Sequence, residues 1–432
     1  MNAESQKLIE LTEYVPEYLD SSEISEEECE MIWQNYKSKI SIEVPSFKNK
    51  RRWALTSLGW VGHIPLSPEM ALVLNPKVPI ENIFGMLEYA YRLKGFKILE
   101  GLTNCDSLNR LYESLAKVLA LRVLDRGRKG FYRAYLPESG RLPYVRGRLD
   151  VRRTCLRPWD ISPECHYEEH TPDVEENQIL AWTLQRILRS GMCTERSLPQ
   201  VRRAYRALHG LAMPTPCSPQ ECVGRHYNRL NQDYQPMHAL CRFFLEQSGP
   251  SHRVGEKTML PFLVDMAHLY ELFVAEWLGS HKSLLPPGFS IKPHEKVVIG
   301  EGNRIRFDID LVLYEGEKAS CVLDTKYKAP ALKKPDLNQI VTYAVTKECR
   351  EAILIYPKPQ EAPLDETIGK IRVRSLTFSL DGDLDRAGRS FLEDLFSKGA
   401  ASSVRGDVGG GPKAPLGRPD GVGGKQCPSF LS

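Results

Sequence analysis

The sequence has no Cys-x-x-Cys pair among its eleven scattered cysteines. A zinc ribbon or zinc finger is therefore not expected, and a reduced compartment is the default. No apolar run approaches the ~18–20 residues that a membrane-spanning helix needs. Residues 1–10 are polar and lack the basic-then-apolar pattern of a secretion signal. These absences predict a cytoplasmic protein without a membrane span.

The chain also lacks a strong excess of charge, since 58 Lys and Arg against 55 Asp and Glu leave a net charge of +3. Any binding of nucleic acid must therefore come from local patches. A phosphate-binding P-loop is missing as well. The segment from Gly249 to Thr258 has five residues between its glycines, and Glu256 precedes Lys257, whereas the motif needs four residues and a Lys directly after the second glycine. We expect no nucleotide to bind this chain.

What is present is an ordinary globular composition, 42% hydrophobic and 26% charged, over 432 residues, which suggests two to three domains. The pattern predicts an α+β protein with an N-terminal β-rich module, followed by helices. The strands expected in the module are Lys39–Val44, Trp53–Leu58 and Met70–Leu74. The expected helices are Ile80–Leu93, Asp106–Leu124, Glu175–Leu188 and Met237–Glu246.

The linker-like run Ser248–Ser251 places a domain boundary near residue 250. We therefore predict an N-terminal region over residues 1–250 and a second domain over residues 251–398. Residues 399–432 contain nine glycines and little apolar content, and a disordered tail is expected there.

Two charged stretches stand out in the N-terminal region. Glu17–Glu30 has seven acids and no base, and Ser25 with Glu28 predicts a capping box that opens a helix. Arg122–Arg157 has eleven Lys or Arg and three acids, with aromatic residues between them. Three interpretations of this basic stretch are open: a grip on DNA phosphates, an interface for an acidic partner, or plain surface with internally paired arginines. Arg146 and Arg148 are its candidate contacts.

The second domain carries the chemistry. Its pattern predicts a Glu271-bearing helix, a strand, a hairpin, a further helix and a buried strand. Their expected bounds are Pro261–Leu278, Lys296–Ile299, Arg304–Leu313 with Ala319–Lys326, Asp336–Thr346 and Glu351–Tyr356.

Side chains alternate along a strand, so Asp324 and Lys326 share one face of the hairpin. Asp308 and Asp310 share a face of the partner strand, and a cluster of Asp308 with Asp324 and Lys326 is compatible with this geometry. Two carboxylates are suitable ligands for Mg²⁺, and a metal-bound water with a nearby ammonium group suits phosphodiester hydrolysis. Surface carboxylates paired with Lys326 are the structural alternative.

An Asp on one hairpin strand and Asp-x-Lys on the other, after a Glu-bearing helix, resemble the PD-(D/E)xK nuclease superfamily. Further segments resemble the McrC family within it, although Phe307 stands where that family usually has proline. The segments are Gly59–Gly62, Leu74–Val78, Tyr144–Arg148, Asp173–Asn177, Asp265–Val274, Arg306–Ile309, Leu323–Lys328 and Asp336–Ala344.

The resemblance implies a PD-(D/E)xK core, a mixed sheet flanked by helices. It also implies a Mg²⁺-dependent endonuclease subunit of a modification-dependent restriction system. Asp308 and Asp324 would bind the metal, Lys326 would position the water, and Glu271 and Gln339 would support the site.

The implied partner is an McrB-like AAA+ GTPase, which uses the GTP, and the implied substrate is double-stranded DNA with methylated cytosine. A stand-alone or helicase-coupled repair nuclease and a non-enzymatic activator of a GTPase stay open. His294 and Glu295 show no metal spacing and are expected to be structural. Tyr343 is expected to pack.

Overall fold

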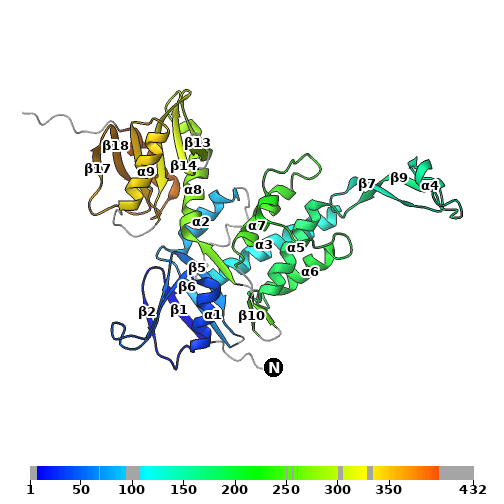
Figure 1. Ribbon diagram of the computed structural model, residues 1–432, viewed down its shortest axis with the longest axis horizontal. Coiled ribbons are helices and arrows are strands. Elements are labelled where there is room, and N and C mark those ends of the chain that lie inside the picture. Colours follow the sequence, from blue (N-terminus) through cyan, green and yellow to red (C-terminus); the bar gives the residue numbers. More distant parts are fainter. Residues whose placement is uncertain are drawn as a thin grey trace, which may run out of the picture.

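The computed structural model describes residues 7–67, 69–93, 108–249, 252–254, 257–259, 261–299, 305–327 and 334–397. The predicted tail, residues 399–432, lies outside the described residues. The described part is an α+β protein with several sheets (Figure 1), as the sequence predicts. No described helix is both long and apolar enough to cross a membrane.

The first sheet has the strand order β1–β6–β5–β12. Its strands are β1 (Lys7–Thr12), β5 (Trp60–Pro65), β6 (Met70–Asn75) and β12 (Phe262–Asp265). At Gly62 a Cβ atom would lie 2.0 Å from the carbonyl oxygen of Phe262, so only glycine lets β5 and β12 approach this closely. Residues beyond the predicted boundary near 250 thus contribute a strand to the N-terminal sheet.

A second small sheet has the order β2–β4–β3 and is accompanied by α1. The elements are β2 (Glu17–Leu19), α1 (Glu26–Tyr36), β3 (Ile40–Glu43) and β4 (Trp53–Ser57). The capping box is confirmed, because Ser25 accepts a hydrogen bond from the Glu28 amide and Glu28 accepts one from the Ser25 amide. The acidic stretch therefore begins a helix whose buried face joins the core of both sheets.

Helices form the middle of the chain, and most begin or end within a few residues of the predicted bounds. They are α2 (Ile80–Ala90), α3 (Leu108–Lys129), α5 (Glu175–Ser190), α6 (Leu198–Leu208) and α7 (Tyr234–Glu246), with a 3₁₀ turn at Pro219–Cys222. Their apolar faces share one large core with α8 (Met266–Ser280). A short hairpin, β10 (His252–Val254) and β11 (Lys257–Met259), follows α7.

The part of the basic stretch that follows α3, together with the residues up to Thr171, forms an arm that projects from the helices (Figure 1). The arm consists of β7 (Ala134–Arg141), β8 (Arg148–Leu149), α4 (Val151–Cys155) and β9 (Glu164–Thr171). Asn177, fully buried at the start of α5, donates hydrogen bonds to the carbonyl oxygens of Tyr132 at 2.9 Å and Pro172 at 2.6 Å. Both ends of the arm are therefore fixed to one buried amide.

The C-terminal sheet has the order β13–β14–β15–β16–β18–β17. Its elements are β13 (Phe289–Ile299), β14 (Ile305–Glu315), β15 (Lys318–Thr325), β16 (Glu351–Tyr356), β17 (Asp365–Ile368) and β18 (Ile371–Thr377), with α8, a 3₁₀ turn at Lys282–Leu284, α9 (Lys334–Thr346) and α10 (Leu384–Phe396). The first three strands pair antiparallel, while β16 is parallel to β15 and β18. Leu311 and Leu323 belong to the α8 core, and Val312 packs in the α9 core. This mixed sheet between helices is the predicted core.

Candidate active site

Asp324 lies near the end of β15, where it is only 2% exposed. The pairing of Leu311 with Leu323 places Asp310 of β14 directly opposite Asp324. Asp310 Oδ2 accepts hydrogen bonds from the backbone N of Thr325 at 2.8 Å and from its Oγ1 at 2.9 Å. The two carboxylates therefore come from neighbouring strands and are held at the same level of the sheet.

Burial, and after it the nearby charge of Asp310, raise the pKa of Asp324 to about 7. The pKa of Asp310 is raised too, first by burial and then by the charge of Glu271. Asp324 Oδ2 is buried, and no hydrogen bond of the described residues reaches it. A cation bound between Asp310 and Asp324 would therefore relieve the repulsion between their two carboxylates.

Lys326 supplies the nearest positive charge. Its Nζ lies 2.6 Å from Asp324 Oδ2, in an ion pair outside hydrogen-bond geometry, and 3.7 Å from Asp336 Oδ1. It donates a hydrogen bond to Gln339 Oε1 at 3.4 Å, and Gln339 Nε2 donates to the Tyr343 hydroxyl at 2.7 Å. Burial lowers the pKa of Lys326, but the surrounding carboxylates outweigh it and raise the pKa. The structure thus brings Asp324, Lys326 and Gln339 together.

Asp308 does not join this cluster. It is exposed and pairs across the strands with Lys296, while the charges acting on Asp324 and Lys326 include that of Asp310. The prediction that Asp308 lies beside Asp324 is therefore corrected to Asp310. The reason is a break in alternation, since Ile309 packs in the same α9 core as Val312, three residues along the strand.

Glu271 of α8 faces the cluster through two histidines. Its carboxylate lies 3.2 Å from His294 Nδ1 and 3.5 Å from His268 Nδ1. Burial alone would raise the pKa of Glu271, but its hydrogen bonds to the two histidines lower it to about 2. His294, which the sequence led us to consider structural, has φ +50 opposite Asp310. The spacing of motif residues in the sequence could not predict that His294 adopts a strained backbone between Glu271 and Asp310.

The donor set limits what metal the site could hold. Among the described residues no three His, Cys, Asp or Glu side chains converge as a metal-binding group. Mg²⁺ commonly uses only one or two carboxylates and completes its shell with water and substrate phosphate. Asp310 and Asp324, whose Oδ2 accepts no hydrogen bond from the described residues, fit that requirement, whereas a closed structural zinc site does not fit.

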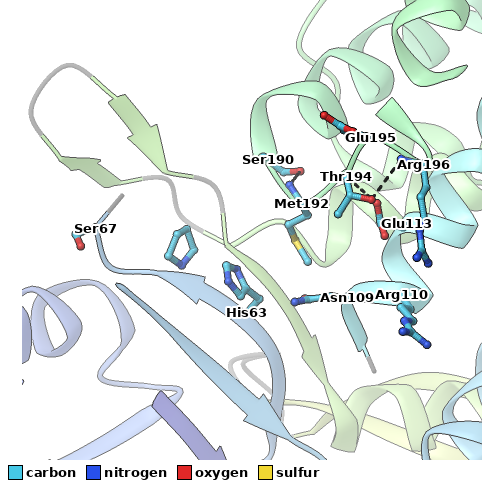
Figure 2. A pocket seen from close by; sticks show the side chains of 12 residues that line it. His63, Ser67, Asn109, Arg110, Glu113, Ser190, Met192, Thr194, Glu195 and Arg196 are labelled. Atoms are coloured by element: carbon cyan, nitrogen blue, oxygen red, sulfur yellow. Dashed lines mark hydrogen bonds between the residues drawn. The ribbon is translucent and has the colours of Figure 1, made fainter. Parts of the chain in front are cut away.

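A separate cavity of about 780 Å³ lies between β5 and the helices. Figure 2 shows His63 on its strand side, and Glu113 with Thr194 on its helical side. Burial lowers the pKa of His63 to about 4, so this side chain is neutral at physiological pH. None of the candidate catalytic side chains lines this cavity, so it shares no residue with the cluster of Asp310, Asp324 and Lys326.

The arm pairs three of its six arginines, Arg141, Arg146 and Arg153, with its own carboxylates. Arg146 lies 2.6 Å from Glu169 and stacks over the Tyr167 ring, and Arg141 pairs with Asp160 at 2.8 Å. Arg148 is exposed, opposite His166. The outer part of the arm instead exposes apolar side chains, namely Tyr144, Val145, Val151, Leu156, Trp159 and Ile161.

Comparisons with known proteins give one consistent result. Residues 55–357 match the family model described as McrBC 5-methylcytosine restriction system component. The chain is 24% identical over 216 residues to the type IV methyl-directed restriction enzyme EcoKMcrBC of Escherichia coli K12, and the match spans 47% of this chain and 59% of that relative.

The fold is similar to that of a chain in the Thermococcus gammatolerans assembly of McrB AAA+ hexamers with bound McrC. That likeness has a TM-score of 0.55 at 17% identity, and it covers 90% of this chain and all of the other.

Proposed function

The chain belongs to the family of McrBC 5-methylcytosine restriction system components, and we propose that it is the Mg²⁺-dependent nuclease subunit of such a system. The observation that supports this most is the cluster of Asp310, Asp324 and Lys326 at the end of a hairpin. The substrate is double-stranded DNA containing methylated cytosine, and the partner is an AAA+ GTPase of the McrB kind.

In this proposal Asp310 and Asp324 hold the metal. When bound, Mg²⁺ supplies charge to the scissile phosphate and lowers the pKa of a coordinated water. Lys326 remains protonated, because neighbouring carboxylates raise its pKa, and it stabilises the negative charge that develops on the phosphate. Gln339 holds the Lys326 ammonium group from α9, and Tyr343 holds Gln339 in turn.

Glu271 acts on the metal site indirectly, through residues that surround it. Its negative charge raises the pKa of Asp310, and its ion pairs fix His294 and His268 at the edge of the site. We assign it a positioning role for that reason.

The arm is the proposed docking element for the GTPase partner. Three of its six arginines, Arg141, Arg146 and Arg153, are paired within the arm, so only half of its guanidinium groups are without an ion pair among the described residues. Its exposed apolar side chains, in contrast, are typical of a protein interface. The related chain that shares this fold was observed with McrB AAA+ hexamers.

The test is cleavage of one plasmid, with and without cytosine methylation, in the presence of Mg²⁺. Each substrate is incubated with the chain alone, with the GTPase partner, and with the partner plus GTP. We expect cutting of methylated DNA only when partner and GTP are both present. Cutting by the chain alone, whatever the methylation, would identify a stand-alone nuclease. Faster GTP hydrolysis without any cutting would identify a non-enzymatic activator.

A further inference from the structure

The loop of residues 44–52, which joins β3 to β4, is the second basic feature of the chain, and the site described above does not use it. We call it the basic loop. Phe47 is 90% exposed at its tip, and the side chain of Lys48 is 83% exposed. Lys50 and Arg51 are exposed too, and no ion pair of the described residues involves either of them.

Internal hydrogen bonds make the basic loop a fixed structure. Asn49 is 3% exposed, and its Oδ1 accepts hydrogen bonds from Ser46 N at 2.6 Å and Ser46 Oγ at 3.0 Å. Its Nδ2 donates to the carbonyl of Val44 at 2.8 Å. The Arg51 amide also donates to the carbonyl of Ser46 at 2.7 Å. One buried amide therefore organises the exposed cations around it.

The backbone of this loop is strained where its cations lie. Lys50 has φ +54 and Arg51 has φ +61, a region that side-chain-bearing residues rarely occupy. Strain of this kind persists where surrounding contacts enforce it, and it is concentrated at functional sites. Here it directs neighbouring cations outward, and the Arg51 guanidinium lies 5.4 Å from the Phe47 ring.

The basic loop belongs to the sheet that touches the candidate nuclease site. Glu13 bridges to Ser57 at the far end of β4, and Glu13 also accepts a hydrogen bond from Tyr327, the residue after Lys326. Trp53, at the loop end of β4, is four residue steps from Ser57, which is about 13 Å at the rise of a strand. β4 alone therefore puts a length of about four base pairs of duplex between the basic loop and the strand end that contacts Glu13.

We propose that the basic loop binds the phosphate backbone of duplex DNA as it leaves the nuclease site. Lys50 and Arg51 have no ion pair among the described residues, and Lys48 has only an exposed pair with Glu43 at 3.5 Å. Such cations beside an exposed aromatic ring suit phosphates and the adjoining sugar or base edge. The loop holds the DNA without reading its sequence or methylation, because it offers charge and not base-specific amides. This proposal rests on the proposed nuclease function.

The test uses the full chain and an unmethylated 30-bp fluorescent duplex, with anisotropy measured across a salt series without partner. The variant K48Q/K50Q/R51Q removes three cations from the loop. The matched control K117Q/R202Q/R229Q removes three exposed cations from the helices and the α7 entry. We expect the loop variant to bind about tenfold more weakly at 50 mM salt, with a salt slope flatter by about 2–3. The control should change affinity less than about twofold.

A second variant, N49A, keeps all the cations but removes the amide that organises them, and we expect it to weaken binding while largely preserving the salt slope. Equal losses in the loop variant and the control would overturn the proposal, as would a wild-type chain that binds no duplex. Intact DNA binding with lost stimulation of the partner GTPase would assign the loop to protein docking instead. Methylation-dependent cleavage by the wild type is measured separately, so failure of the nuclease proposal is distinguishable from failure of this one.

Discussion

Glu13 of the N-terminal sheet region accepts a hydrogen bond from the hydroxyl of Tyr327 at 3.1 Å, across 314 residues of sequence. Glu13 is fully buried, and its Oε2 also accepts from the Lys77 amide at 2.9 Å. Tyr327 directly follows Lys326, so this contact joins the N-terminal module to the nuclease strand. A change in the module therefore has a direct route to the position of Lys326.

The contact predicts a difference between two substitutions at Glu13. Glu13→Gln keeps an acceptor for both donors, so folding and cleavage should stay near wild type. Glu13→Ala removes the acceptor of the buried Tyr327 hydroxyl and of the part-buried Lys77 amide. The loss at the buried donor costs roughly 1–3 kcal/mol, and the variant should slow cleavage at least tenfold. Thermal melting and plasmid cleavage measure these effects. Wild-type stability and cleavage in Glu13→Ala would show that the contact carries no coupling.

The two aspartates of β14 provide a matched pair for the metal site. Asp310→Asn should abolish cleavage, because it removes the carboxylate opposite Asp324. Asp308→Asn should leave cleavage within about twofold of wild type, because Asp308 is exposed and lies outside the cluster. Both variants should still stimulate the partner GTPase. This control shows that they are folded and bind the partner. Loss of cleavage in Asp308→Asn, with cleavage kept in Asp310→Asn, would identify Asp308 as the metal ligand.

Asp324 predicts a pH dependence with a defined sign. Its pKa in the folded chain is about 7, above its ordinary value, because burial disfavours the charged form. Its contribution to the free energy of unfolding is therefore present at low pH and lost as pH rises through 7. In metal-free buffer the wild type should lose stability between pH 5 and 8 by a few kcal/mol more than Asp324→Asn does.

Mg²⁺ should reverse that loss, since the metal competes with the proton for Asp324. The increase in melting temperature on adding Mg²⁺ should be larger at pH 8 than at pH 6, and absent in Asp324→Asn. A Mg²⁺ effect equal at both pH values would show that Asp324 is not a ligand.

Much of this arrangement could be predicted from local patterns. The Asp324-x-Lys326 strand, the helix with Gln339 and the helix with Glu271 all follow from alternation, caps and apolar periodicity, and the structure brings Lys326 and Gln339 together. Asp308 was predicted beside Asp324, but the structure places Asp310 there, because the alternation breaks at Ile309 and counting every second residue cannot detect such a break.

Contacts between distant segments could not be predicted from the sequence for a different reason. The pairing of β12 with β5 and the Glu13–Tyr327 hydrogen bond join segments hundreds of residues apart. No spacing rule relates such segments, and a buried Glu is rare enough that sequence alone favours exposure. The strain at His294 is equally hidden, because nothing in a one-letter code reports φ.

The arm predicts a separation between partner activation and folding. Trp159 is 78% exposed and Ile161 is 98% exposed near its tip, so replacing both with alanine removes no buried contact and should leave the melting temperature within about 1–2 °C. If the tip is the docking surface, the loss of two exposed apolar anchors should reduce stimulation of the partner GTPase at least tenfold.

Arg148→Gln is the matched control on the same arm, because it removes an exposed charge and leaves the apolar tip intact. We expect this variant to lower stimulation of the partner GTPase less than threefold. The salt dependence of that stimulation should stay close to that of the wild type. A double alanine variant that stimulates the GTPase like wild type, while Arg148→Gln does not, would assign docking to charge. That outcome would restore the interpretation of the basic stretch as a cationic interface, because apolar burial at the tip would then contribute little to the complex.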